Sequence, residues 1–126
     1  MDKDKKSLKR FIKSFTYAFE GIKYSFYHEQ NIIVMLFLGI IAIVMGFIFK
    51  IGYMEKLTII LLIAIILPLE LINTAIEAVV DLHDGDKKSK YGKVAKDCAS
   101  AALLVASLFA LVIGIIIFMP HIIELF

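Results

Sequence analysis

The chain has 126 residues, of which 60% are hydrophobic, and its formal net charge is only +2. This composition excludes an ordinary soluble globular domain, and the length allows one domain, residues 1–126. A single cysteine, Cys98, excludes an intrachain disulfide and a metal site built from several cysteines. The start is charged and the first apolar run is too long for a cleaved signal sequence, so we expect a mature membrane protein.

The N-terminal segment has the pattern of an amphipathic helix. After a short charged tail, residues 7–27 repeat apolar side chains at helical spacing, and basic and aromatic residues occupy the opposite face. The apolar positions are Leu8, Phe11, Ile12, Phe15, Phe19, Ile22 and Phe26. The segment is too polar to cross a bilayer. Its composition predicts a helix that lies in the membrane interface.

Three further segments are apolar enough to be transmembrane helices, at residues 30–49, 57–81 and 93–119. The second contains Pro68, which interrupts the helical hydrogen bonds and predicts a bend shortly before Glu70. Pro120 is expected to end the third. The sequence therefore predicts an all-α integral membrane protein with three spans and an N-terminal interfacial helix.

The distribution of basic residues predicts the orientation. Seven Lys and Arg residues precede the first span and five lie from Lys87 to Lys96, against two from Lys50 to Lys56 and none after Lys96. Such an imbalance places the N-terminal segment and the loop after the second span in the cytosol.

The second span carries a stripe of polar side chains toward that side. On a helix, with Glu70 taken as zero, Glu77 falls at about −20°, Asp81 at about +20° and Asn73 at about −60°. Carboxylates are costly in hydrocarbon and repel one another unless a cation or proton lies between them. The stripe therefore predicts a metal or proton site. A polar seam that joins helices by hydrogen bonds is the alternative interpretation.

Carboxylate oxygens without histidine or thiolate partners favour Mg²⁺. The nearby lysines suit phosphates bridged to that metal, and the deeper Glu70 is placed to act as general base toward a lipid hydroxyl group. These features favour phosphoryl transfer from a nucleotide to a lipid. Two other hypotheses remain: an ion-coupled transporter in which Glu70 relays a proton, and a structural membrane protein. The chain contains neither a GxxxxGK[ST] loop nor protein-kinase motifs.

The run from Glu70 to Asp81, together with the motif Ala95-Lys96-Asp97, closely resembles the small membrane-embedded bacterial diacylglycerol kinases. That family includes the undecaprenol kinases. The likeness covers nearly the whole chain and extends to Arg10, Tyr17, Gly21 and Glu29. The loop between Asp81 and Lys96 is one residue longer than in the best-known member.

The resemblance implies a homotrimer in a bacterial inner (cytoplasmic) membrane, with active sites at the cytosolic interface that are shared between protomers. It implies Glu70 as general base, Glu29 and Glu77 as ligands of Mg²⁺ and ATP, and Asn73 and Ser100 on the lipid side. The other implied ATP contacts are Arg10, Tyr17, Asp86, Lys96 and Asp97. The partners are then ATP, a lipid alcohol and membrane lipids, with no nucleic acid. Whether the alcohol is undecaprenol or diacylglycerol stays open.

Overall fold

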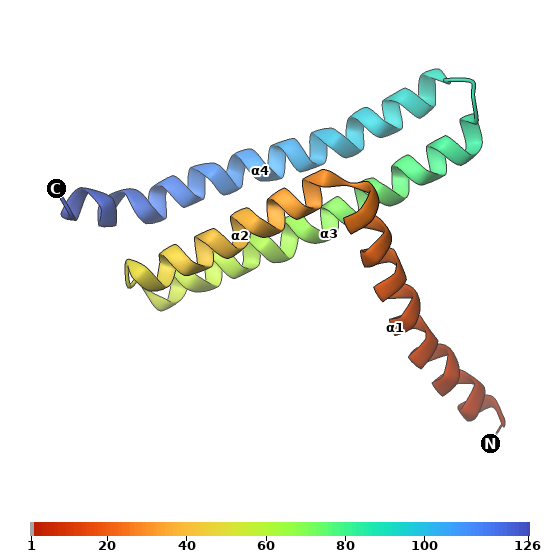
Figure 1. The fold of residues 1–126 in the computed structure, drawn as a ribbon, viewed down its shortest axis with the longest axis horizontal. Coiled ribbons are helices and arrows are strands. Elements are labelled where there is room, and N and C mark those ends of the chain that lie inside the picture. The colour runs from red at the N-terminus through yellow and green to blue at the C-terminus, as the bar shows by residue number, and fades with distance from the viewer. Residues whose placement is uncertain (1) are drawn as a thin grey trace.

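The computed structural model describes residues 2–126, which form four helices and, within that range, no strand. They are α1 (Asp2–His28), α2 (Gln30–Ile48), α3 (Tyr53–Asp84) and α4 (Lys90–Glu124). Helices α2, α3 and α4 run side by side, and α1 leaves this bundle at a steep angle near the start of α2 (Figure 1). Helices α2, α3 and α4 are each long and apolar enough to cross a membrane. The predictions of an all-α chain and three candidate spans are confirmed.

Two predicted helix ends are wrong. The expected charged tail is helical from Asp2, where Asp2 and Asp4 in the first turn complement the positive end of the helix dipole; Met1 lies outside the described residues. Helix α4 continues through Pro120 to Glu124. A proline this close to the end removes one backbone hydrogen bond, and the last turn still forms.

Helix α3 is the centre of the bundle. It is continuous through Pro68 and packs against α4 along its length and against α2 along its first half. Helix α1 contacts α2 and α3 only near the corner where α2 begins. Two glycines of α2 allow close approach: Gly39 faces Ile63, and Gly46 faces Ile51. Because α3 lies between its neighbours, it holds its polar stripe at the junction of all the other helices.

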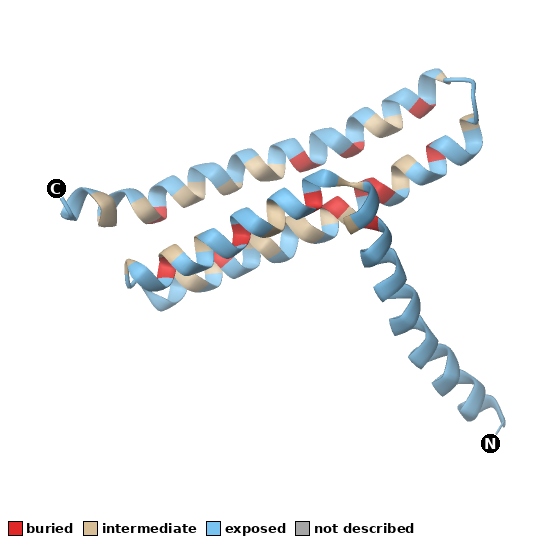
Figure 2. Cartoon of the chain, in the orientation of Figure 1, coloured by how far each residue is buried: buried red, intermediate tan, exposed pale blue. Residues whose placement is uncertain are grey.

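Few side chains are buried within the protomer (Figure 2). The buried apolar core is a cluster of Ile51, Ile59 and Ile117 near the α2–α3 connection. Most other large apolar side chains of α2, α3 and α4 point outward, as expected for helices that face lipid or other membrane helices. The buried polar residues lie instead near the corner between α1 and α2, and they mark the candidate site.

Candidate active site

The corner between α1 and α2 closes over the middle of α3. Ser25 of α1 is only 2% exposed, so its small side chain allows α1 to pack closely at this corner. Its carbonyl oxygen accepts a hydrogen bond of 2.8 Å from the backbone N–H of Glu29. Glu29 has extended backbone angles and precedes the first turn of α2. The turn at this corner therefore places the Glu29 carboxyl group against Glu77 of α3.

Three carboxyl groups meet at this corner. Glu70 of α3 is 2% exposed and is the largest fully buried side chain of residues 2–126. A hydrogen bond with Glu77, followed by burial and then by the charges of Glu77 and Glu70, raises the pKa of Glu29 to about 7. With a pKa of about 7, the Glu29 carboxyl group is about half protonated at neutral pH, and a cation can replace that proton. We call Glu29, Glu70 and Glu77 the carboxyl cluster.

Asn73 adds an amide to this cluster. It is buried, and its side-chain nitrogen donates a hydrogen bond of 3.3 Å to Glu77 Oε1. Its amide oxygen is also buried but accepts no hydrogen bond from residues 2–126. Thr74, which follows, donates from its hydroxyl group to the Glu70 backbone oxygen at 3.0 Å. Asn73 thus contacts one carboxyl group and keeps one acceptor unpaired within residues 2–126.

The end of the polar stripe is paired with α4. Lys96 Nζ donates to Asp81 Oδ1 at 2.6 Å, and Lys93 Nζ donates to Asp97 Oδ2 at 2.7 Å. Both pairs are largely exposed. Asp81 therefore pairs with a cation of the neighbouring helix. The Lys96 ammonium group lies at the mouth of the site.

Several residues that the resemblance implies are not assembled within one protomer. Arg10 and Tyr17 lie exposed on α1, and Tyr17 is 63% exposed. Asp86 lies in the exposed turn after α3, and Ser100 is exposed on α4. Within residues 2–126, none of them makes a side-chain hydrogen bond or ion pair with the carboxyl cluster. Only the carboxyl cluster, Asn73 and Lys96 converge within the protomer.

Sequence reasoning missed the contacts that join α3 to α4. Asp84 accepts hydrogen bonds from the Ser89 hydroxyl group at 2.8 Å and from the Ser89 backbone N–H at 3.2 Å. The Ser89 oxygen in turn caps α4 by accepting the backbone N–H of Gly92 at 3.0 Å. We call these three residues the loop clasp. The sequence signal for this cap is a serine just before the start of a predicted helix, three residues before Gly92. The clasp lies one turn from Asp81 on α3 and one turn from Lys96 on α4.

The donor set at the corner suits Mg²⁺. Within residues 2–126 no group of three or more His, Cys, Asp or Glu side chains is placed to hold a metal ion by itself. Mg²⁺ usually keeps several waters and binds through one or two carboxylates together with substrate phosphates. Glu29 and Glu77, whose carboxyl groups are close enough to share a proton, meet that requirement and leave the remaining positions open.

Comparison with known proteins gives consistent results. The family model for prokaryotic diacylglycerol kinase matches residues 16–118. A protein named diacylglycerol kinase from Synechocystis sp. is 33% identical over 112 residues, which are 89% of this chain and 64% of that protein. A protein named undecaprenol kinase from Bacillus subtilis is 38% identical over 113 residues, which are 90% of this chain and 91% of that one. The match spans less than two thirds of the Synechocystis protein and nearly all of the Bacillus one.

Proposed function

Because this chain belongs to the prokaryotic diacylglycerol kinase family, we propose that it transfers the γ-phosphoryl group of ATP to the hydroxyl group of a membrane lipid. The two relatives are named for diacylglycerol and for undecaprenol, and both alcohols are candidate acceptors. The observation that carries the proposal is a fully buried carboxyl group in a candidate membrane span, Glu70, which lies next to the carboxyl groups of Glu77 and Glu29.

The proposed roles follow the positions of the side chains. Glu29 and Glu77 would hold Mg²⁺, which would neutralise negative charge on the phosphate oxygens. Glu70 lies ~10 Å from Glu77 along α3, on the side toward the interior of the span. It accepts the proton of the lipid hydroxyl group. The lipid oxygen forms the new bond to phosphorus while the bond to the ADP oxygen breaks.

The remaining groups position the reactants. Asn73 fixes Glu77 through its amide nitrogen and offers its free oxygen to the lipid hydroxyl group. The Lys96 ammonium group pairs with Asp81 in the absence of ATP. When ATP binds, it leaves Asp81 and pairs with the phosphates. The charge distribution along the chain supports the placement of this end in the cytosol.

We further propose that the active unit is a homotrimer in which α1 lies in the membrane interface. The broad apolar exterior of the protomer supports this assembly, since helices with so few internal contacts bury more surface by associating. The proposed ATP contacts Arg10, Tyr17, Asp86 and Asp97, and Ser100 on the lipid side, would then complete sites between protomers. A monomer that remains fully active would contradict this assembly.

The test of the chemistry is Glu70→Gln, which retains shape and hydrogen bonding but removes the base. We expect kcat for phosphorylation of a lipid alcohol to fall by roughly 10²–10⁴-fold, with little change in KM for ATP. Glu20→Gln, at an exposed position of α1, is the matched control and should turn over normally. Near-normal turnover in the Glu70 variant would refute the role, because a residue that merely joins helices tolerates an amide.

The same assay separates the kinase from a proton-coupled transporter. A kinase releases ADP from Mg-ATP only as fast as the lipid alcohol is phosphorylated, and it stops when the alcohol is omitted. A transporter that uses Glu70 as a proton relay needs polar access from both sides of the membrane. The buried polar groups of residues 2–126 gather near the α1–α2 corner, which favours the kinase.

A further inference from the structure

The last turn of α1 carries a pair of aromatic side chains beside the carboxyl cluster. The rings of Tyr24 and His28 are stacked, with their centroids 4.0 Å apart and an angle of 16° between their planes. His28 Nδ1 also lies 3.0 Å from the backbone oxygen of Tyr24. A carbonyl oxygen only accepts hydrogen bonds, so Nδ1 carries the proton and donates it to this oxygen. We call Tyr24 and His28 the aromatic brace.

The aromatic brace holds the exposed side of the turn from which Glu29 follows. Helix ends fray, because their last carbonyl groups have no partner within the helix. Ser25 is buried and fixes the side of this turn that faces the bundle. Tyr24 and His28 lie on the exposed side, where the stack and the Nδ1 hydrogen bond tie the end of α1 to the turn before it.

The position of Glu29 depends on that turn. Its carboxyl group does not cap the first N–H groups of α2 and lies against Glu77 instead. Within residues 2–126, no hydrogen bond or ion pair joins His28 to Glu29. An imidazole ring that turned toward the adjacent carboxylate would pair with it and occupy one of its oxygens. The aromatic brace keeps the ring on α1 and leaves both Glu29 oxygens to α3.

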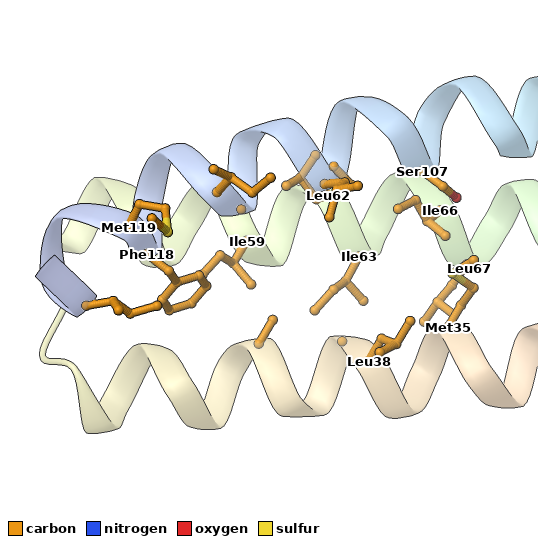
Figure 3. A pocket seen from close by; sticks show the side chains of 17 residues that line it. Met35, Leu38, Ile59, Leu62, Ile63, Ile66, Leu67, Ser107, Phe118 and Met119 are labelled. Atoms are coloured by element: carbon orange, nitrogen blue, oxygen red, sulfur yellow. The ribbon is translucent and has the colours of Figure 1, made fainter.

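The other concave part of the protomer supplies no ligand for a cation. An apolar groove of about 470 Å³ runs along α2, α3 and α4 (Figure 3). Ser107 is the one polar residue of its lining. Because Mg²⁺ takes oxygen ligands and keeps several waters, its protein ligands must come from the polar corner at the end of α1. What fixes this corner therefore fixes the proposed metal site.

We propose that His28, stacked on Tyr24, is a positioning residue that holds Glu29 at the Mg²⁺ site. The inference rests on the proposed function and adds to it a residue that acts only through Glu29. Without the aromatic brace the last turn of α1 frays, and the Glu29 carboxyl group leaves Glu77 for part of the time. The affinity for Mg²⁺ then falls. The value of kcat at saturating Mg²⁺ changes little, because Glu70 and Glu77 stay in place on α3.

Anchoring in the membrane interface is the other role that two aromatic rings at this depth can have. Tyr27 provides the comparison, since it is 77% exposed on the same turn and its ring lies 6.0 Å from the Lys23 ammonium group. An anchoring ring acts through its apolar surface and needs neither a parallel partner nor an N–H donor. The stack and the Nδ1 hydrogen bond therefore favour positioning.

The first test is a Mg²⁺ titration of turnover with the full chain in nanodiscs. Groups that touch a metal ligand directly contribute roughly 10–100-fold to metal affinity. The aromatic brace acts through the backbone, so in His28→Ala we expect the Mg²⁺ concentration for half-maximal turnover to rise by less, about fivefold. We expect kcat and KM for the lipid alcohol to stay unchanged. His28→Phe keeps the stack and should restore most of the affinity.

Tyr27→Leu is the matched control and should titrate like the wild type. Unchanged Mg²⁺ dependence in His28→Ala would refute the positioning role. A lower Mg²⁺ requirement would also refute it, because His28 would then act as a charge that opposes the metal. An equal rise in Tyr27→Leu would assign the effect to anchoring in the interface and overturn the proposal.

The second test needs neither turnover nor metal. In a Cys98→Ala background, Glu29→Cys and Glu77→Cys are joined by a short bismaleimide, and the intramolecular product is followed by intact mass. We expect His28→Ala to slow this reaction several-fold and Tyr27→Leu to leave it unchanged. Should His28→Ala fail to fold, Tyr24→Leu removes the stack and retains the backbone acceptor. Equal rates with and without the aromatic brace would overturn the proposal. A wild type that phosphorylates no alcohol would refute the proposed function instead, and the crosslinking rates would still decide the role of His28.

Discussion

Two glycines of α4 should respond in opposite directions to the same substitution. At Gly92, an added methyl group would lie 2.7 Å from the Ser89 oxygen and 3.0 Å from Val80 Cγ1, and it would also collide with Asp84. These oxygens cannot move away freely, because they form the hydrogen bonds of the loop clasp. Gly92→Ala must therefore break the clasp or separate α3 from α4.

The expected cost follows from the interactions that are lost. The Ser89 cap contributes about 1 kcal/mol, and loss of the bond from Ser89 to Asp84 adds to that cost. Replacement of a helical glycine by alanine stabilises the helix by up to about 1 kcal/mol, whereas the contact with Val80 adds strain. We expect Gly92→Ala to lower the free energy of unfolding by about 1–2 kcal/mol. Gly114→Ala meets no atom within 4 Å and should raise it by up to about 1 kcal/mol.

The assay is unfolding by SDS in mixed micelles, followed by circular dichroism, for the wild type and both variants. Because Gly92 lies about one turn before Lys96, its variant should also raise KM for ATP, whereas Gly114→Ala should not. A Gly92→Ala variant at least as stable as Gly114→Ala would refute the argument, since it would mean that the loop clasp contributes nothing to the α3–α4 junction.

Three further outcomes are expected at the carboxyl cluster and the lysine beside it. Glu29 has its pKa raised from 4.5 to about 7, so the stability that its proton contributes without Mg²⁺ is complete below about pH 4.5 and is lost as pH rises through about 7. Since Mg²⁺ displaces that proton, the apparent affinity for Mg²⁺ should rise about tenfold per pH unit up to about pH 7 and then level off. A Mg²⁺ titration of turnover from pH 5.5 to 8 tests this. A flat wild-type profile would contradict it. Glu77→Gln should raise the Mg²⁺ concentration for half-maximal turnover at least about tenfold, and unchanged Mg²⁺ dependence would remove it from the metal site. Lys96→Ala should leave the free energy of unfolding nearly unchanged, because its pair with Asp81 is exposed. It should nevertheless raise KM for ATP roughly tenfold or more, unlike the exposed control Lys88→Ala.

The sequence by itself was sufficient for the elements and for the residues on one helix face. Hydropathy predicted the three candidate spans because a long apolar helix needs no partner to satisfy its backbone hydrogen bonds. The helical period likewise aligned Glu70, Asn73 and Glu77 on one side of α3, since that relation is local. The charged residues at the start of the chain were predicted to form a tail, but they are helical from Asp2. Good helix formers and favourable interactions with the helix dipole outweighed the low hydrophobicity of this segment.

The tertiary structure decided which of these side chains meet. The turn at the α1–α2 corner places Glu29 against Glu77, and the loop clasp joins α3 to α4 next to the place where Lys96 reaches Asp81. These are contacts between segments far apart in the chain. They depend on interhelical packing and turn geometry, which a pattern along a single helix does not encode.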